Sequence, residues 1–303
     1  MMSTQPVIVT VPATTANLGP GFDCLGLALS LYNRVTFCEQ KATFAITIAG
    51  EGADWLPTDE SNLVWQAAQR LFEAVGRWPG GIAIHQENKI PAGSGMGSSA
   101  AAVVAGLVAA NALVNGGLSP LQLLELATDI EGHPDNVAPA LFGGLTLINQ
   151  TDNGLHLERI PVPPLTVVII LPDFHLPTAQ ARAALPPTIT RADAIFNIGR
   201  MGLLVRALEA GDWDKLRVAM QDRLHQPYRL PLVPGLKEAF AAAYQAGAVG
   251  VALSGAGPSL IAFAPTAHDK IAAASAAALA QAGLRSRSWI LSVDMTGTVS
   301  SKQ

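Results

Sequence analysis

Residues 89–101, KIPAGSGMGSSAA, carry the strongest local signal in the chain. Three glycines stand at alternate positions, and glycine lets a backbone approach a ligand closely. The segment runs directly into an apolar stretch from Ala100 that is expected to be helical. The start of a helix offers free N–H groups and the positive end of the helix dipole, which together bind anions. The pattern predicts a phosphate-binding turn, with Ser98 and Ser99 placed to contact a phosphate oxygen or a metal ion.

Three other interpretations of residues 89–101 compete with a phosphate-binding turn. A plain one is a glycine-rich turn before a buried helix, with Ser98 acting only as its cap. A Walker A loop requires a Gly-Lys-Ser/Thr ending, and no lysine follows the glycines here. A dinucleotide fingerprint requires Gly-x-Gly-x-x-Gly and an acidic residue about 20 positions later. The glycines at 93, 95 and 97 have the wrong spacing, and Glu125 lies too far along.

The composition limits the partners. Of 303 residues half are hydrophobic and 14% are charged, the formal net charge is −4, and no run of Lys or Arg occurs. This argues against nucleic acid or an anionic membrane as the main partner. A phosphate ligand must therefore be held mostly by backbone N–H groups, helix ends and a metal ion.

Cysteine usage and apolar runs favour a cytoplasmic protein. Cys24 and Cys38 show neither a disulfide framework nor metal-ligand spacing, so two buried free thiols in a reducing compartment are expected. The N-terminal residues lack the basic and apolar regions of a signal peptide. The apolar stretch 100–114 contains Asn111 and is shorter than the roughly 20 residues that span a bilayer.

Hydrophobic patterning predicts an α+β fold in two domains. An edge strand or the first strand of the sheet is expected to end at Pro12, and a polar loop is expected over 133–139. Further strands are predicted at 34–37, 44–48, 81–85, 145–149, 166–172, 250–253, 260–264 and 286–290, and helices at 63–75, from 100, and at 120–130, 191–210, 213–224, 236–246 and 267–282. Neither half alternates strand and helix regularly enough for a doubly wound sheet. The proline-rich residues 160–164 resemble a linker, so domains are predicted at 1–163 and 164–303.

Three separated motifs resemble those of the GHMP kinases, and they occur in the same order. They are PATTANLGPGFD at 12–23, the turn at 91–101 with Met96 where that superfamily more often has leucine, and LSGAGPS at 253–259. The resemblance covers essentially the whole chain. It implies an N-terminal ATP-binding domain of the ribosomal-protein-S5-like type, a ferredoxin-like C-terminal domain, and an active site between them.

Further positions are similar to the homoserine kinase family within that superfamily. These are Gly21-Phe22-Asp23, HPDNVAP at 133–139, the pair Thr178 and Arg182, and QPYR at 226–229. The resemblance implies an enzyme that transfers phosphate to an alcohol group. Its reaction would be phosphorylation of the side-chain hydroxyl of L-homoserine by ATP, giving O-phospho-L-homoserine for threonine biosynthesis.

The resemblance also places candidate residues around a small zwitterionic substrate. Arg182 and Arg229 supply guanidinium groups that can grip a carboxylate, Thr178 stands one helical turn before Arg182, and Asp23 can hold an ammonium group. The candidate catalytic residues, which would orient the hydroxyl, are Asn17, His133, Asp135 and Asn136. Plainer roles are a helix cap for Asn17, loop-bracing hydrogen bonds for Asp23 and His133, and solvated charge for either arginine.

ATP and Mg²⁺ are the implied cofactors. The expected nucleotide-binding residues are Pro91, Ala92, Gly93, Ser94, Gly95, Met96, Gly97, Ser98, Ser99, Ala100, Ala101, Gly255, Gly257 and Ser259. The resemblance implies Ser98 and Glu125, which stands eight residues before His133, as the Mg²⁺ ligands. Such a set suits Mg²⁺, which prefers few carboxylates together with waters and phosphate oxygens. The alternative for Glu125 is an exposed helix charge. Asp135 is not assigned as a base, because positioning and charge neutralisation can drive phosphoryl transfer.

Two other functions stay open. One is a kinase for another small alcohol such as mevalonate or galactose, which would not need two arginines and Asp23. The other is an inactive relative that only binds a ligand or a protein. A homodimer is considered possible.

Overall fold

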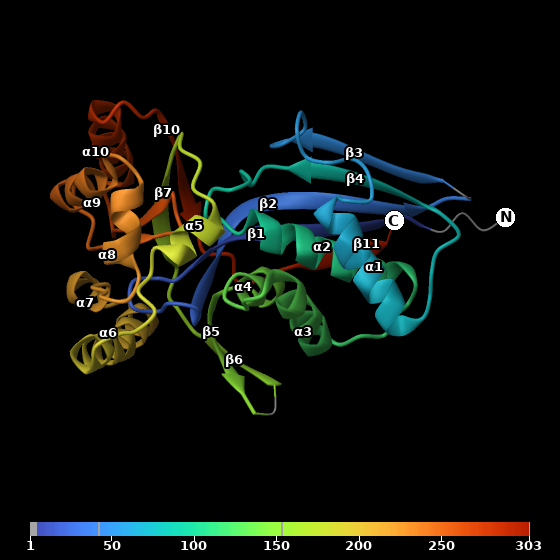
Figure 1. The fold of residues 1–303 in the computed structure, drawn as a ribbon, viewed down its shortest axis with the longest axis horizontal. Coiled ribbons are helices and arrows are strands. Elements are labelled where there is room, and N and C mark those ends of the chain that lie inside the picture. Colours follow the sequence, from blue (N-terminus) through green and yellow to red (C-terminus); the bar gives the residue numbers. More distant parts are fainter. Residues whose placement is uncertain (1–4, 42, 153, 303) are drawn as a thin grey trace.

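A computed structural model of the chain describes residues 5–41, 43–152 and 154–302, which build two β-sheets with helices packed against them (Figure 1). The first four residues of the N-terminal segment, in which no signal peptide is expected, lie outside the described part. The first sheet has the order β11-β1-β2-β4-β3, and β5 pairs with β2 and β6. Its strands are β1 (Val7–Ala16), β2 (Leu25–Glu39), β3 (Phe44–Gly50), β4 (Ile82–Asn88), β5 (Leu145–Thr151), β6 (Gly154–Ile160) and β11 (Val299–Lys302).

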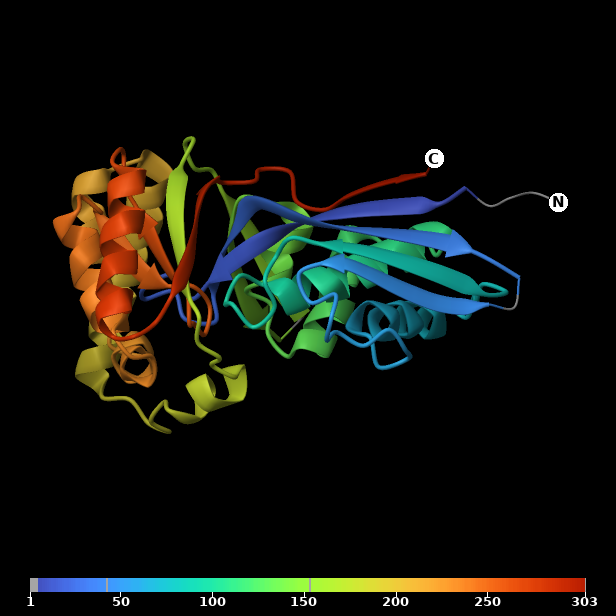
Figure 2. The ribbon, with the colours of Figure 1, turned by 90° about the horizontal axis from the view of Figure 1, so that it is seen from above.

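The second sheet is smaller and antiparallel, with the order β10-β7-β9-β8. Its strands are β7 (Thr166–Pro172), β8 (Gly250–Leu253), β9 (Leu260–Phe263) and β10 (Ser286–Ser292). Helices form separate groups beside the two sheets, so the predicted α+β class is confirmed (Figure 2). The larger sheet carries α1 (Leu63–Val75), α2 (Ser98–Leu113), α3 (Pro120–Glu131) and α4 (Val137–Phe142). The remaining helices are α5 (Thr178–Ala183), α6 (Arg191–Ala210), α7 (Trp213–Ala219), α8 (Gln226–Arg229), α9 (Leu236–Gln245) and α10 (His268–Gln281), with a 3₁₀ turn at Leu230–Leu232.

Helix α2 is the central helix of the N-terminal half. Most of its residues are alanine, valine or leucine, and nine of them are buried, because the helix lies between the first sheet and helices α1 and α3. Gly106 permits the close crossing with α1, since a Cβ at that position would lie 2.2 Å from the Val64 carbonyl oxygen. The first turn of α2 is thereby fixed at the end of the sheet that faces the C-terminal half (Figure 1).

Several elements differ from the sequence-based expectation. Strand β1 is not an edge strand and does not end at Pro12, because it continues to Ala16 with β11 and β2 on its two sides. Pro12 is accommodated at a register shift with β2, beyond the residues that pair with β11. Helix α7 ends at Ala219, five residues early, and α4 occupies part of the expected polar loop. Strands β6 and β11 were not predicted.

The two halves share one core. Val9 and Leu27 of the first sheet belong to the same buried cluster as Val167 and Phe263 of the second. The last strand, β11, returns to pair with Val7–Thr10 of β1, so the C-terminal residues belong to the first sheet. The predicted domain boundary between residues 163 and 164 stays a prediction. Cys24 and Cys38 are free as expected, but both are half-buried and not buried. No helix in the described ranges is both long and apolar enough to cross a membrane.

Candidate active site

Three loops that are distant in sequence meet at the N-terminus of α2. The backbone N–H of Thr14, in the first motif, donates to the carbonyl of Met96 in the glycine turn at 3.1 Å. The N–H of Gly255, in the third motif, donates to the carbonyl of Ala16 at 3.0 Å. Backbone hydrogen bonds therefore join all three motif segments into one assembly.

The close approach of these loops explains two of the glycines. Gly95 has φ +78°, and a Cβ there would lie 2.2 Å from the carbonyl oxygen of Ser254. Gly97 has φ +68°, and a Cβ there would lie 1.9 Å from the Oγ1 of Thr14. Both the left-handed backbone and the contact exclude a side chain.

The first turn of α2 opens into the pocket formed by these loops. The helix begins at Ser98, and Gly97 provides no side-chain cap, so the N–H groups of residues 98–100 have no partner within the helix. Ser98, Ser99 and Ala100 all line the pocket. This arrangement is suited to phosphate oxygens, as the glycine pattern predicted.

One carboxylate lines the same pocket beside α2, and it belongs to Glu131. The hydroxyl of Ser99 donates to Glu131 Oε1 at 2.5 Å, and burial raises the pKa of Glu131 although that hydrogen bond lowers it. Glu125, the metal ligand expected from the sequence, is exposed and outside the pocket. It lies beside the β5–β6 hairpin instead: a Cβ built on Gly154 of that hairpin would be 3.5 Å from Oε1 of Glu125. Glu131 follows Glu125 by six residues, which is about 600° of rotation in an α-helix. The two side chains therefore point about 120° apart and lie on different faces of α3.

The loop between α3 and α4 supplies the polar wall. The Asp135 side chain is buried, and its Oδ1 lies 3.3 Å from Nδ1 of His133. The interaction with Asp135 raises the pKa of His133, although neither atom has a hydrogen-bond partner of good geometry among the described residues. Asn136 accepts a hydrogen bond from the Thr14 hydroxyl at 2.9 Å, so the amide is held against the first motif.

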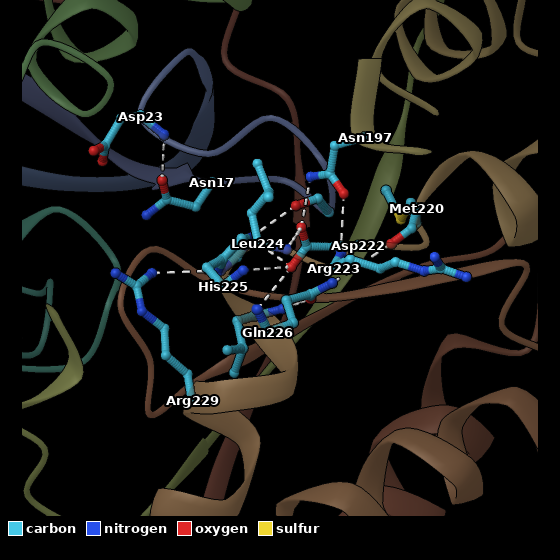
Figure 3. Close-up of polar contacts among 12 residues, drawn as sticks. Asn17, Asp23, Asn197, Met220, Asp222, Arg223, Leu224, His225, Gln226 and Arg229 are labelled. Carbon is cyan, nitrogen blue, oxygen red and sulfur yellow. Dashed lines mark hydrogen bonds and ion pairs between the residues drawn. The ribbon is translucent and has the colours of Figure 1, made fainter. Parts of the chain in front are cut away.

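Asn17 and Asp23 are linked at the first motif (Figure 3). Asn17 has φ +58° and accepts a hydrogen bond from the Asp23 N–H at 2.7 Å, so it braces the loop while it lines the pocket. The Asp23 carboxylate forms a two-pronged ion pair with Arg182, at 2.9 and 3.1 Å. This ion pair raises the pKa of Arg182.

Arg229 is a buried cation at the edge of the pocket. Its residue is 1% exposed, and its Nε donates to the carbonyl of Ala181 at 3.2 Å. The guanidinium lies 5.1 Å from the centre of the Phe22 ring. Burial, together with the positive charge of Arg182, lowers the pKa of Arg229 to about 10, so the group is still charged at neutral pH. No carboxylate among the described residues forms an ion pair with Arg229, and a buried guanidinium of this kind is suited to bind an anionic ligand.

The pocket brings together most of the residues singled out from the sequence. Those that line it are Asn17, Gly93, Ser94, Gly95, Gly97, Ser98, Ser99, Ala100, His133, Asp135, Asn136, Thr178, Arg182, Arg229, Gly255 and Gly257. Asp23 reaches it through Arg182, and Met96 and Ser259 are buried beneath it. Pro91, Ala92 and Ala101 line adjoining cavities. Sequence reasoning missed Glu131, Leu176 and Ala256.

An adjoining cavity of about 350 Å³ was also missed. It shares Gly93, Ser98 and Ser99 with the pocket and is walled by Trp55 and Asn62, among others. Asn62 also caps α1, because its side chain accepts from the Val64 N–H at 3.0 Å. A largely apolar cavity that continues from a phosphate-binding turn is suited to a flat aromatic base.

The fold and this pocket are those of a small-molecule kinase. Residues 62–144 match the family model of the GHMP kinases N terminal domain, and residues 204–281 match that of the GHMP kinases C terminal domain. The homoserine kinase of Moorella thermoacetica is 46% identical over 279 residues, which cover 92% of this chain and 94% of that protein. For the homoserine kinase of Desulfitobacterium hafniense the identity is 47% over 293 residues, with 96% and 98% covered. The chain belongs to the GHMP kinase superfamily and, within it, to the homoserine kinase family.

A solved structure agrees with that placement. The crystal structure of homoserine kinase from Cytophaga hutchinsonii superposes with a TM-score of 0.89 at 34% identity and covers 99% of both chains. The structure of L. major mevalonate kinase, with a TM-score of 0.76 at 18% identity, shares the fold. The resemblance to the GHMP kinases that the three motifs indicated is thus confirmed.

Proposed function

We propose that this chain transfers the γ-phosphate of ATP to the side-chain hydroxyl of L-homoserine, giving O-phospho-L-homoserine for threonine biosynthesis. One observation carries the proposal: the free first turn of α2 and the buried guanidinium of Arg229 line the same pocket. A phosphate group and a substrate carboxylate are thereby given separate sites a short distance apart. The homoserine kinases to which the chain is related support the choice of substrate.

The triphosphate would lie on the glycine turn and the first turn of α2. Backbone N–H groups and the helix dipole stabilise its negative charge without any lysine. The base would enter the adjoining cavity beside Trp55, which shares Gly93 and Ser98 with the pocket. This arrangement suits a chain with few surface cations.

Homoserine would be held at both ends of its zwitterion. Its carboxylate pairs with Arg229 and with Arg182, whose guanidinium groups lie 5.1 and 5.8 Å from the centre of the Phe22 ring. Its ammonium group pairs with Asp23, which Asn17 and Arg182 already hold in place. With both ends fixed, the side-chain hydroxyl is directed toward the phosphate turn.

Mg²⁺ fits the donor atoms present. No group of three or more His, Cys, Asp or Glu side chains able to hold a metal occurs among the described residues. The half-buried carboxylate of Glu131 and the hydroxyls of Ser98 and Ser99 border the turn, a set that leaves room for phosphate oxygens and water. When bound, Mg²⁺ neutralises charge on the phosphate groups.

The chain itself contributes positioning more than proton transfer. The hydroxyl oxygen attacks the γ-phosphorus in line with the departing ADP, through a loose transition state. His133 and Asn136 border the space where the hydroxyl would lie, and the Asp135 carboxylate lies 3.3 Å from Nδ1 of His133. Holding the two reactants in line then accounts for most of the acceleration. Homodimer formation and a cytoplasmic location stay predictions.

A coupled assay for ADP release tests the substrate. With Mg²⁺ and ATP present, we expect turnover with L-homoserine to exceed that with L-serine, mevalonate or shikimate by at least about 100-fold in kcat/KM, since only homoserine offers both charged ends and a hydroxyl at the right reach. Faster turnover of mevalonate than of homoserine would assign the chain to a different acceptor. Nucleotide binding without turnover of any alcohol would indicate an inactive relative.

Arg229→Ala should raise KM for homoserine roughly 30-fold, which corresponds to about 2 kcal/mol for one charge-assisted contact. KM for ATP should stay within about twofold, because the base and triphosphate lie on the N-terminal half. Arg223→Ala is the matched control, since its side chain is half exposed and pairs with Asp193 away from the pocket. An unchanged KM for homoserine in Arg229→Ala would remove this residue from the substrate site.

A further inference from the structure

A buried histidine behind Arg229 has no role in the function proposed above. His225 is 0% exposed and precedes the short helix α8, which carries Arg229 (Figure 3). Its ring stacks on that of Phe22, with 5.2 Å between the ring centres and 27° between the planes. The ring therefore lies between the first motif and the guanidinium of Arg229.

The hydrogen bonds of His225 determine which nitrogen carries its proton. The Nε2 atom lies 2.7 Å from the carbonyl oxygen of Gly19, which can only accept, so Nε2 must be the donor. Burial lowers the pKa of His225, although the nearby Asp222 carboxylate opposes the shift, so the ring is neutral at neutral pH. Nδ1 then has a free lone pair, and it lies 3.4 Å from Nη1 of Arg229. Nδ1 accepts a hydrogen bond from the guanidinium.

Asp222 fixes the histidine from the other side. Its carboxylate is fully buried and accepts hydrogen bonds from the N–H groups of His225 at 3.0 Å and Gln226 at 2.7 Å. The side-chain amide of Asn197 donates to it at 2.7 Å, which ties the loop to α6 (Figure 3). The backbone at His225 is therefore immobilised, and the ring can be placed only by rotation about two side-chain bonds.

The guanidinium of Arg229 is oriented by its other contacts. Nε donates to the carbonyl of Ala181, and Nη1 is shared between Nδ1 of His225 and the carbonyl of Gly255 at 3.4 Å. Nη2 has no hydrogen-bond partner among the residues that the structure describes. The acceptors of Nε and Nη1 thus set the direction in which Nη2 faces. Two of these acceptors are backbone carbonyls, and the third is the side chain of His225.

We propose that His225 is a positioning residue for homoserine binding, in which the lone pair of Nδ1 holds the Arg229 guanidinium at the orientation that receives the substrate carboxylate. The inference rests on the proposed function. Because a guanidinium fork binds a carboxylate only in a narrow range of orientations, a loose Arg229 would bind the same ligand less tightly.

His225→Ala should raise KM for homoserine roughly 10-fold, the effect of losing one hydrogen bond to a charged group. We expect kcat and KM for ATP to change by less than about threefold, because the contact acts on substrate binding alone. A purely structural histidine would lower the active fraction and thus kcat, with KM unaltered, and that outcome would overturn the proposal. His268→Ala is the control: it removes a partly buried histidine that contacts the Ala264 carbonyl, away from the pocket.

Two conservative variants separate the contacts of the ring. His225→Asn keeps an acceptor close to the position of Nδ1 and loses the donor to Gly19, whereas His225→Gln keeps a donor close to Nε2 and loses the acceptor. We expect Asn to restore KM for homoserine to within about threefold of wild type and Gln to resemble alanine. Rescue by Gln and not by Asn would show that His225 acts through the first motif, contrary to the proposal.

The wild-type protein separates failure of the inference from failure of the function. If wild type shows no ADP release with L-homoserine, the proposed function is wrong. If wild type is active and His225→Ala leaves its KM for homoserine unchanged, with a melting temperature near that of wild type, only the positioning role is wrong.

Discussion

Glu131→Gln is expected to lower kcat by roughly 1,000-fold at low Mg²⁺, corresponding to about 4 kcal/mol, whereas Glu125→Gln is expected to leave kcat unchanged. The two substitutions are chemically identical and lie on the same helix, α3. Only Glu131 lines the pocket, where it accepts a hydrogen bond from Ser99 at the start of α2. Glutamine retains an oxygen for that hydrogen bond and removes the negative charge.

The measurement is kcat as a function of Mg²⁺ concentration for both variants and wild type. The Glu131 variant should need a higher Mg²⁺ concentration for half-maximal activity, because a neutral amide is a weaker ligand for a hard cation. Circular dichroism provides the folding control. If Glu125→Gln lost activity and Glu131→Gln did not, our assignment of the metal-binding carboxylate would be reversed.

Gly95→Ala is expected to abolish measurable turnover and to destabilise the protein by about 3 kcal/mol or more. A Cβ at this position would lie 2.2 Å from the Ser254 carbonyl oxygen and 2.8 Å from that of Gly257. Both neighbours are backbone atoms, which cannot rotate away as a flexible side chain can. The first and third motifs would therefore have to separate from the glycine turn, and the phosphate site would lose its shape.

Gly117→Ala is the matched control for this change. Gly117 has the same φ of +78°, but a Cβ there meets nothing within 4 Å. It should destabilise the protein by only about 1–2 kcal/mol, the cost of a left-handed alanine, and leave kcat intact. Urea denaturation and initial rates on both variants make the comparison. Equal losses of stability in the two variants would show that the contact with the third motif contributes nothing.

Features that depend on neighbouring residues were predictable from the sequence. The phosphate turn was predicted because its alternate glycines and the helix that follows are a local signal, and the structure places the free start of α2 there. Helix α6 was also predicted, since Thr190 caps its first turn and Gly211 ends it in a left-handed conformation. In such cases the residues that form an element also define its ends.

Features that depend on distant contacts were not predictable. Strand β11 becomes a strand only because β1, almost 300 residues earlier, offers an unpaired edge. The helix expected to reach residue 224 ends at Ala219, and the Asp222 carboxylate then accepts from the backbone N–H groups of Leu224, His225 and Gln226. Glu131 was missed for a related reason: the face of α3 that meets the pocket is set by packing against α2 and α4.

We expect ATP and homoserine to meet between the first turn of α2 and Arg229. A crystal structure of the chain with a non-hydrolysable ATP analogue, Mg²⁺ and L-homoserine tests it most directly. We predict a triphosphate on the N–H groups of residues 98–100, the metal ion against Glu131, and the homoserine carboxylate against Arg229. A triphosphate bound elsewhere, or an Arg229 guanidinium turned away from the amino acid, would contradict the account.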